Sequence, residues 1–521
     1  MKGITSSVIF LLIFLNSFSN GSKILCIFPG VAHSHYTLGY AISKELAKKG
    51  HEVTYVSPFP EKNKVENLKS VVLTGFLELA TEMMKSVNLF DMAGISPLIG
   101  IVSLGNMGLM LSEETLKNEA LQTILKSNEK FDLVISESFF LDSFHAIANH
   151  YNAPSVLIST IGSSIWTNHL VGIPDIPSFM PNIYLGIENP QQTFCQRIQT
   201  LLLNIVQKLF DHIYFYPKQN QLIKKFFPNS PDVFDLIYNT SLILTNSHIS
   251  FTKPQLNSPN MIEIGGYHVD EPKKLPQDLE KILNDAKNGV IYFSMGSNLK
   301  GNKLYPEIRE KLLKVFGKLK QTVLWKFEDD NLPGKPENVI IRKWFPQNDI
   351  LAHRNIKLFI THGGLLSTIE SIYHGIPMVA IPVFGDQMMN AAYAASEGYA
   401  INIPFQKLNE ESFFNGINQV LNNEKYRKNV QIKSKIFHDQ QVKPIDKATY
   451  WIEYVIRHTG AKHLRLPSVN LPNYQFYMVD ILAVMTVLIG VSFVLFCVSA
   501  RWIIRRCNRR PTLVGNKIKK N

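Results

Sequence analysis

Cysteine is scarce in this chain, with four residues among 521. Cys497 lies in a long apolar run, Cys507 lies in a basic tail, and Cys26 lies in an apolar segment typical of a strand. Cys195 is therefore the only possible partner for Cys26. The sequence predicts no disulfide framework, and 521 residues are enough to bury the cores of two domains without one.

Common cofactor and metal signatures are also missing. The first expected strand is not followed by G-x-G-x-x-G, which disfavours a nicotinamide-dependent oxidoreductase. There is no D-x-D motif and no His/Cys cluster at metal-ligand spacing. We therefore expect neither a metal ion nor an organic cofactor.

Acidic residues are absent from residues 501–521, which hold eight of the lysines and arginines. The formal net charge is +12, so only +4 belongs to residues 1–500. Residues 481–500 carry no charge and are long enough to cross a bilayer as a helix. The basic tail therefore indicates a cytoplasmic flank rather than binding to nucleic acid.

The N-terminus resembles a secretory signal. Lys2 precedes an apolar run at 8–15, and small residues follow at 17, 19 and 21, where we expect cleavage. A retained anchor is the alternative, although the run is too short to span a bilayer. The signal predicts a single-pass type I protein whose larger part lies in the lumen. Asn239 is then a candidate glycosylation site.

The tail carries a second targeting signal. Lys517 and Lys519 stand five and three residues from the end, in the spacing of the K-x-K-x-x retrieval signal. The sequence therefore predicts residence in the endoplasmic reticulum membrane.

Strand and helix patterns alternate twice along the chain. The first half has expected strands at 23–28, 52–57, 131–136, 155–160 and 241–247, with helices at 36–49 and 141–151. The second half has strands at 290–294, 322–327, 339–342, 356–361 and 376–382, with helices at 304–320, 348–353, 385–397 and 408–422. This pattern predicts two parallel α/β sheets joined by a linker at 263–274. Segments 60–130 and 161–235 are expected to form much of an apolar acceptor pocket.

The stretch 342–390 organises the second half. His362, Gly363 and Gly364 end one expected strand and lead into a helix at 365–374. Glycine lets the backbone approach a phosphate, and the free N–H groups at a helix start favour negative charge. The sequence therefore predicts that this turn cradles a diphosphate.

Side chains suited to the rest of a nucleotide sugar surround that turn. Trp344 is expected to stack on a base, Gln347 to bind a base edge and Glu370 to bind ribose hydroxyls. Asp386 and Gln387 follow the next strand and are expected to bind a hexose. Core packing for Trp344 and helix capping for Glu370 are the alternatives.

In order, W-x-P-Q, H-G-G-x-x-S-T-x-E, H-G-I-P and D-Q-x-x-N resemble the signature of the UDP-glycosyltransferases, which include the UDP-glucuronosyltransferases. Segments 294–297 and 460–465 resemble the family too. The resemblance implies an α/β fold of two Rossmann-like domains facing across a cleft (GT-B), plus a C-terminal transmembrane helix. The expected segments are a signal peptide (1–21), an acceptor-binding domain (22–265), a UDP-sugar-binding domain (266–445), a helix packing back plus linker (446–476), the transmembrane helix (477–500) and the cytoplasmic tail (501–521).

The resemblance also implies the catalytic pair. Family members carry S-H in the loop after the first strand, and Ser34-His35 supplies it here. His35 is the expected general base, with His33 as the competing choice. The family orients this histidine with an aspartate, but the matching position is Glu137, and Asp142 is a possible substitute.

The leaving diphosphate needs hydrogen-bond donors if no metal takes part. Backbone N–H groups at 362–364 and the hydroxyls of Ser297, Ser367 and Thr368 are the candidates. Preorganised donors of this kind contribute roughly 2.7–4 kcal/mol each. Leu366 replaces an asparagine of many relatives, and Lys326 stands where some have arginine.

Together these features predict an inverting, metal-independent transfer of a hexose from a UDP-sugar to a hydroxyl of a small lipophilic acceptor. UDP-glucose is preferred as the donor because no second cation is evident for the carboxylate of UDP-glucuronate, which is the alternative. A membrane-tethered lipophile-binding protein without catalysis is a further alternative. The sequence does not indicate the acceptor or the oligomeric state.

Overall fold

The computed structural model describes residues 21–508 except 62, 86 and 188–190. Most of the expected signal peptide and the two lysines of the retrieval signal lie outside the described residues. Residues up to Leu466 form one compact unit, and the chain from Pro467 onward forms a second.

The first sheet is parallel and seven-stranded, in the order β3-β2-β1-β4-β5-β6-β7. Its strands are β1 (Lys23–Ile27), β2 (Glu52–Ser57), β3 (Leu68–Val72), β4 (Leu133–Glu137), β5 (Ser155–Ser159), β6 (Leu242–Thr245) and β7 (Met261–Glu263). Alternate residues of β1 enter different cores: Leu25 and Ile27 pack on one face, Ile24 and Cys26 on the other. The run is apolar throughout because both faces are covered.

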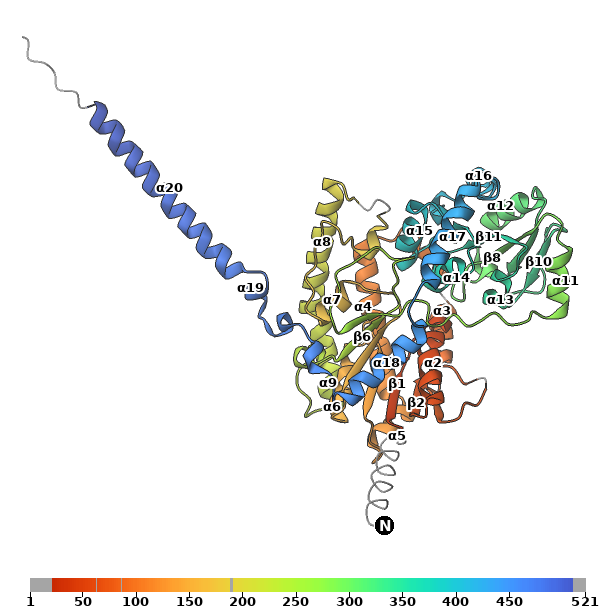
Figure 1. The fold of residues 1–521 in the computed structure, drawn as a ribbon, viewed down its shortest axis with the longest axis horizontal. Helices are drawn as coiled ribbons and strands as arrows, with labels where there is room; N and C mark the ends of the chain where they lie inside the picture. The colour runs from red at the N-terminus through yellow and green to blue at the C-terminus, as the bar shows by residue number, and fades with distance from the viewer. Residues whose placement is uncertain (1–20, 62, 86, 188–190, 509–521) are drawn as a thin grey trace, which may run out of the picture. The chain divides into compact units, whose positions relative to one another are not determined.

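Helices cover both faces of this sheet (Figure 1). They are α2 (His33–Lys48), α3 (Phe76–Lys85), α4 (Pro97–Lys117), α5 (Glu119–Lys126), α6 (His145–His150), α7 (Ile165–Leu170), α8 (Phe194–Phe210), α9 (Tyr216–Phe226) and α10 (Val233–Ile237). A late helix, α18 (Pro444–Arg457), packs on the same domain: Ala448, Ile452 and Val455 are fully buried in the core that contains Leu38 and Ile42 of α2.

The second sheet is parallel and six-stranded, in the order β10-β9-β8-β11-β12-β13. Its strands are β8 (Val290–Ser294), β9 (Thr322–Lys326), β10 (Val339–Arg342), β11 (Ile356–Thr361), β12 (Met378–Ala380) and β13 (Ala400–Asn402). Its helices are α11 (Gln277–Asp285), α12 (Pro306–Gly317), α13 (Gln347–Leu351), α14 (Leu365–Tyr373), α15 (Asp386–Ser396), α16 (Glu410–Asn422) and α17 (Glu424–His438).

Both sheets reverse their strand order once. The reversal lies between β1 and β4 in the first sheet and between β8 and β11 in the second. Open parallel sheets bind ligands beyond the carboxyl ends of the strands at such a reversal. His35, Ser297 and the turn 362–364 lie in the segments that follow β1, β8 and β11, and Glu137 is the last residue of β4.

The structure corrects several boundaries. The first helix begins at His33, so His35 lies in its first turn and not in the preceding loop. Three strands, β3, β7 and β13, and helices α11 and α17 were not predicted. Each missed strand lies at an edge of its sheet and has five or three residues, so its hydrophobic pattern is weak.

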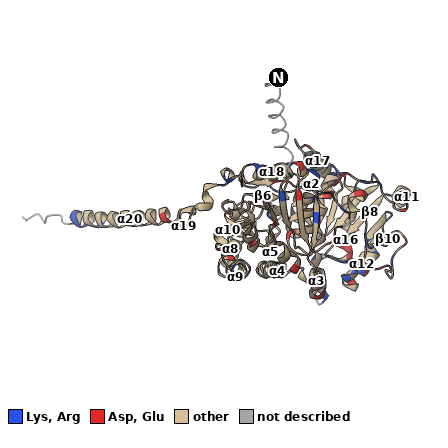
Figure 2. Cartoon of the chain, turned by 90° about the horizontal axis from the view of Figure 1, so that it is seen from below, with Lys and Arg blue, Asp and Glu red and all other residues tan. Residues whose placement is uncertain are grey.

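Helix α20 (Val479–Asn508) belongs to the second unit and is the described helix that is long and apolar enough to cross a membrane. Figure 2 shows it uncharged along its length, with Asp480 at its start and arginines at its end. The four cysteines are free, as the sequence predicts.

Candidate active site

The imidazole of His35 hydrogen-bonds to a buried carboxylate. Its Nδ1 contacts Oε1 of Glu137, whose side chain is fully buried. His35 is in the first turn of α2 and Glu137 ends β4, so the two strands at the sheet reversal place the pair. Thr160 donates to the same oxygen at 3.2 Å. Of the two carboxylates considered, Glu137 is the one bonded to His35, and Asp142 lines a neighbouring cavity.

Charges from both sheets determine the protonation of His35. Burial disfavours the imidazolium, but Glu137 and then Asp386 stabilise it, so the pKa of His35 lies above its usual value. Asp386 is the first residue of α15, in the second half of the chain. Burial raises the pKa of Asp386, while Asn390 and His35 act against that rise. The influence is mutual, so the imidazole of His35 and the carboxylate of Asp386 lie near enough to interact electrostatically.

His33, the competing base, lies in an aromatic cluster. Its ring centroid is 5.6 Å from that of Phe59 and 5.9 Å from that of Trp344. Its Nδ1 is 3.2 Å from the hydroxyl of Thr37. His33 therefore provides a contact between the first domain and Trp344, the residue expected to stack on the base.

Two glycines enclose the ring of His362. A Cβ at Gly296 would lie 2.6 Å from its Cε1, and a Cβ at Gly364 would lie 2.4 Å from its Nε2. Gly296 and Gly363 also have φ values of +79° and +78°, which glycine adopts readily. Burial, with Lys326 nearby, lowers the pKa of His362 to about 4, so the ring is neutral. The uncharged imidazole of His362 is therefore packed tightly between Gly296, which follows β8, and Gly364, which follows β11.

The side chain of Gln347, the first residue of α13, hydrogen-bonds to the side chain of Glu370 in α14. Nε2 of Gln347 donates to Oε2 of Glu370 at 2.8 Å and to the hydroxyl of Ser367 at 3.2 Å. Burial raises the pKa of Glu370 to about 7, against the bond from Gln347. Trp344 is 59% exposed, so core packing does not hold it and its face is accessible.

Asp386 and Gln387 have different surroundings. Asn390 donates to Oδ2 of Asp386 at 2.8 Å and to the carbonyl of Gly363 at 3.1 Å, which ties α15 to the glycine turn. Gln387 is buried and its Oε1 accepts from the backbone N–H groups of Val383 and Phe384. A hydrogen bond from Gln387 to a sugar would therefore have to come from its amide nitrogen.

The remaining hydroxyls lie near the same turn. Ser297 is half-buried, Ser367 and Thr368 are buried in the first turn of α14, and Thr368 donates to the carbonyl of Gly364 at 3.1 Å. Asn390 and Thr160 were not predicted as site residues. Asn390 stands four residues after Asp386, one helical turn away, and that spacing within D-Q-x-x-N was the available signal.

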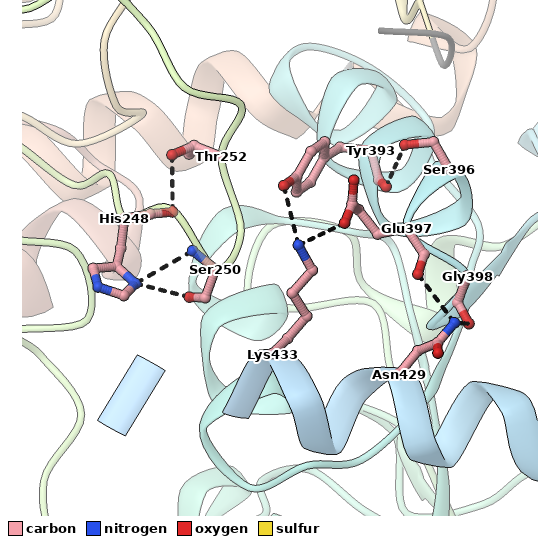
Figure 3. A network of polar contacts seen from close by, with 9 residues as sticks. All are labelled: His248, Ser250, Thr252, Tyr393, Ser396, Glu397, Gly398, Asn429 and Lys433. Carbon is pink, nitrogen blue, oxygen red and sulfur yellow. Dashed lines mark hydrogen bonds and ion pairs between the residues drawn. The ribbon is translucent and has the colours of Figure 1, made fainter. Parts of the chain in front are cut away.

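Helix α17 packs against the carboxyl end of α15 (Figure 3). Lys433 contacts Oε2 of Glu397 at 2.6 Å and the hydroxyl of Tyr393 at 3.4 Å. Asn429 donates to the carbonyl of Gly398 at 3.0 Å. These contacts fix the carboxyl end of the helix whose first residue is Asp386.

A cavity lies between the two halves of the chain, beside this site. Ser163, Phe179 and Lys253 line it from the first half, and Leu365 and Asn390 line it from the second. Among the described residues, no group of three or more His, Cys, Asp or Glu side chains gathers at metal-binding distance. Metal independence remains a prediction.

Two parallel sheets with facing sites define the GT-B class of glycosyltransferase, and solved structures share the fold. The glycotransferase of kitacinnamycin superposes with a TM-score of 0.58 at 16% identity, covering 84% of this chain and all of that one. The UDP-glucosyltransferase from Polygonum tinctorium gives 0.57 at 14% identity, covering 84% of this chain and 99% of that one.

Sequence comparison identifies the family. Residues 22–511 match the family model described as UDP-glucoronosyl and UDP-glucosyl transferase. UDP-glucosyltransferase 2 of Dactylopius coccus is 34% identical over 97% of this chain and 98% of its own length. UDP-glucuronosyltransferase 2B15 of Rattus norvegicus is 30% identical over 95% of both chains. This chain belongs to the UDP-glycosyltransferase family and is a glycosyltransferase, as its motifs predict.

Proposed function

We propose that this enzyme transfers a hexose from a UDP-sugar, with inversion at the anomeric carbon, to a hydroxyl of a small lipophilic acceptor. The observation that supports the proposal is that His35, bonded to Glu137, interacts electrostatically with Asp386, which Asn390 links to the carbonyl of Gly363. A base on one sheet and an anion cradle on the other are what a direct displacement requires.

The acceptor is activated by the free nitrogen of His35. Its Nδ1 faces Glu137, so Nε2 takes the proton of the acceptor hydroxyl. The acceptor oxygen then forms a bond to the anomeric carbon while the bond from that carbon to the diphosphate breaks. Glu137 orients the ring and stabilises the imidazolium that forms.

The leaving UDP is stabilised without a protein-bound metal in this proposal. Backbone N–H groups of the turn 362–364 and of the first turn of α14 face the diphosphate, and Ser297, Ser367 and Thr368 add hydroxyl donors. Gln347, Glu370 and the accessible face of Trp344 take the uridine.

Glucose is the preferred sugar. Lys326 is close enough to His362 to affect its pKa, but its ammonium contacts Oε1 of Glu328 at 2.8 Å and the carbonyl of Gly296 at 3.0 Å. A cation that is already paired offers little to a uronate carboxylate. Relatives are named as glucosyl and as glucuronosyl enzymes, so the donor must be measured.

The enzyme is proposed to reside in the endoplasmic reticulum membrane, with both sheets in the lumen and the basic tail in the cytoplasm. The support is one described membrane-length helix followed by arginines. The signal peptide and the retrieval lysines of the sequence support the same orientation.

The test uses membranes from cells expressing the full chain, supplied with UDP-glucose or UDP-glucuronate and a phenolic acceptor. We expect glucoside formation in the wild type and a loss of roughly 10²- to 10⁴-fold in His35→Ala. Transfer from UDP-glucuronate alone would overturn the donor assignment. Unchanged turnover in His35→Ala would overturn the assignment of the base, and absence of any transfer would favour the non-catalytic binding protein.

A further inference from the structure

Helix α8 directs its large apolar side chains away from the first domain. These side chains recur mostly at intervals of three or four residues, which places them along one face of the helix. Six of them are between 39% and 69% exposed: Phe194, Ile198, Leu201, Leu202, Ile205 and Leu209. A surface helix of a globular protein normally buries such a face, so the orientation of α8 is inverted.

The inward face of α8 is polar instead. Thr200, Asn204 and Gln207 are buried. The hydroxyl of Thr200 donates to Oε1 of Gln192 at 2.9 Å. Nδ2 of Asn182 donates to Oδ1 of Asn204 at 3.0 Å and to Oε1 of Gln207 at 3.1 Å. Turning the helix to bury its apolar face would break these buried hydrogen bonds, so the fold itself keeps that face outward.

Helix α4 enlarges this apolar surface. It packs beside α8 (Figure 1), where a Cβ at Gly105 would lie 2.7 Å from Cε1 of Phe210. Near the start of α4, Leu98, Ile99 and Val102 are between 43% and 55% exposed. These three residues and the six of α8 are called the α4–α8 face. An exposed apolar surface built from two helices marks a site of protein or membrane interaction.

The charges around the α4–α8 face suit a lipid surface. Residues 95–112 carry no charge, and residues 193–210 carry two cations, Arg197 and Lys208, and no acid. Arg197 donates to a backbone carbonyl at 2.9 Å, and Lys208 pairs with Asp175 at 2.6 Å. Neither cation is unpaired, so contact with lipid would not strip water from an isolated charge.

The geometry of α8 is that of a helix lying in the membrane interface. Its 17 residues are about 26 Å long, which is less than the roughly 30 Å of a bilayer core. Its polar side is bonded to the first domain along its length. The helix can therefore bury its apolar side in the interface but cannot cross the bilayer.

A membrane is within reach of this face. Residues 467–478, twelve in number, connect the first unit to α20, the proposed membrane span. A chain of that length extends at most about 43 Å. Anchoring by α20 thus keeps the first unit at a high effective concentration near lipid, so a modest affinity for lipid is enough for docking.

We infer that the α4–α8 face docks on the surface of the membrane that α20 crosses, with Arg197 and Lys208 at the level of the lipid headgroups. The contact is peripheral, and the inference rests on α20 spanning the membrane. Asn204, on the inward side of α8, lines the cavity between the two halves of the chain. Docking therefore places that cavity roughly one helix diameter, about 10 Å, from lipid. Lipophilic acceptors that concentrate in the bilayer would enter close to the proposed site.

The experiment uses the full chain with a protease recognition sequence inserted between Leu471 and Pro472, which are both exposed. The protein is reconstituted into phosphatidylcholine vesicles. Protease added outside then separates the first unit from α20 in the molecules whose first unit faces outward. Flotation separates bound from free first units. We expect the first unit to float with the vesicles after cleavage, in high salt as well, because the contact is apolar.

Two double variants locate the contact. Leu201→Glu with Ile205→Glu places two acids one turn apart on the α4–α8 face and should lower the ratio of bound to free first unit at least about tenfold. Ile432→Glu with Ile436→Glu is the matched control, because it places two acids one turn apart at exposed apolar positions of α17. The control should float like the wild type. Thermal melting followed by circular dichroism shows whether each variant is folded.

Each outcome has a distinct meaning. Release of the wild-type first unit on cleavage, release by high salt, or equal loss of flotation in both double variants overturns the inference. Failure of the uncleaved chain to float overturns it together with the proposed membrane span. A first unit that does not float but forms dimers, lost only in Leu201→Glu with Ile205→Glu, also overturns it and assigns the face to a contact between copies. Sugar transfer is not part of the readout, so the proposed catalysis is tested separately.

Discussion

The carboxylate of Asp386, on the second sheet domain, raises the pKa of the His35 imidazole on the first, and His35 in turn lowers that of Asp386. The two residues are 351 positions apart in the sequence: His35 lies in the helix that follows β1, and Asp386 begins the helix that follows β12. Their proximity brings the proposed base to the proposed sugar site. It also makes the protonation of His35 sensitive to carboxylates on both sides of the cleft.

The pH dependence of turnover tests this arrangement. A general base must be neutral to accept a proton, so kcat/KM should rise with pH through the pKa of His35. Glu137 stabilises the imidazolium and holds that pKa above its usual value, against burial. Glu137→Gln should therefore move the acidic limb to lower pH, while the plateau falls by roughly 10²-fold or more.

Glu137→Asp is the matched control, because it keeps the charge but shortens the reach. We expect it to keep the acidic limb near its wild-type position and to recover part of the plateau rate. If the limb stayed in place in Glu137→Gln, His35 would not be the group that titrates.

The glycines around His362 are predicted to be required for donor binding. In Gly364→Ala the new methyl would lie 2.4 Å from Nε2 of His362, and in Gly296→Ala it would lie 2.6 Å from Cε1. Displacing the ring distorts the turn beside the diphosphate site. We expect the Kd for UDP, measured by calorimetry, to rise at least about tenfold in each variant.

Gly334→Ala separates the steric effect from backbone strain. Gly334 has φ +75°, close to the +79° of Gly296, but a methyl group added there would have no atom within 4 Å. Gly334→Ala should lower the melting temperature by an amount similar to that in Gly296→Ala and leave UDP binding intact. Weakened UDP binding in Gly334→Ala would mean that general destabilisation explains the loss.

Donor affinity is predicted to depend on pH through Glu370. Burial raises the pKa of this carboxyl to about 7, and Asp349 adds to that rise. The ionised form accepts hydrogen bonds from ribose hydroxyls, so the KM for UDP-sugar should fall as pH rises from about 6 to about 8. Glu370→Gln should raise KM and abolish this dependence.

Asp349→Asn provides the directional control. Removing its charge lowers the pKa of Glu370, so the fall in KM should shift to lower pH without disappearing. An unchanged KM profile in both variants would place the ribose elsewhere.

Several strands were predictable from the sequence, whereas the roles assigned to the second-sheet site residues stay predictions. Four strands, β2, β8, β10 and β11, have the predicted boundaries, because buried parallel strands are short, continuous apolar runs between turn residues. The edge strand β13 has only the residues Ala400–Asn402 and carries no such signal. Helix α17 was missed because charged residues outnumber its buried ones, Tyr426, Val430 and Phe437.

The hydrogen-bond partners of the site side chains could not be predicted from the sequence, because they depend on tertiary contacts. The motif identified Gln387, but the sequence does not show that Val383 and Phe384 occupy its amide oxygen. Similarly, the resemblance gave Glu137 as the partner of His35 and left Asp142 as a substitute, and the position of β4 beside β1 brings Glu137 to the imidazole.

Truncation tests the predicted roles of helices α18 and α20. A chain ending at Leu466 keeps the whole first unit and lacks α20, so alkaline extraction should release it from membranes, and it should still bind UDP and transfer sugar. A chain ending at residue 443 also lacks α18, which exposes the apolar face of α2 around Leu38 and Ile42. Large exposed apolar patches cause aggregation, so the shorter chain should be insoluble. Sedimentation after alkaline extraction of membranes, followed by size-exclusion chromatography, distinguishes these results. If the chain ending at Leu466 stayed with the membrane after this extraction, elements of the first unit would have to cross the bilayer.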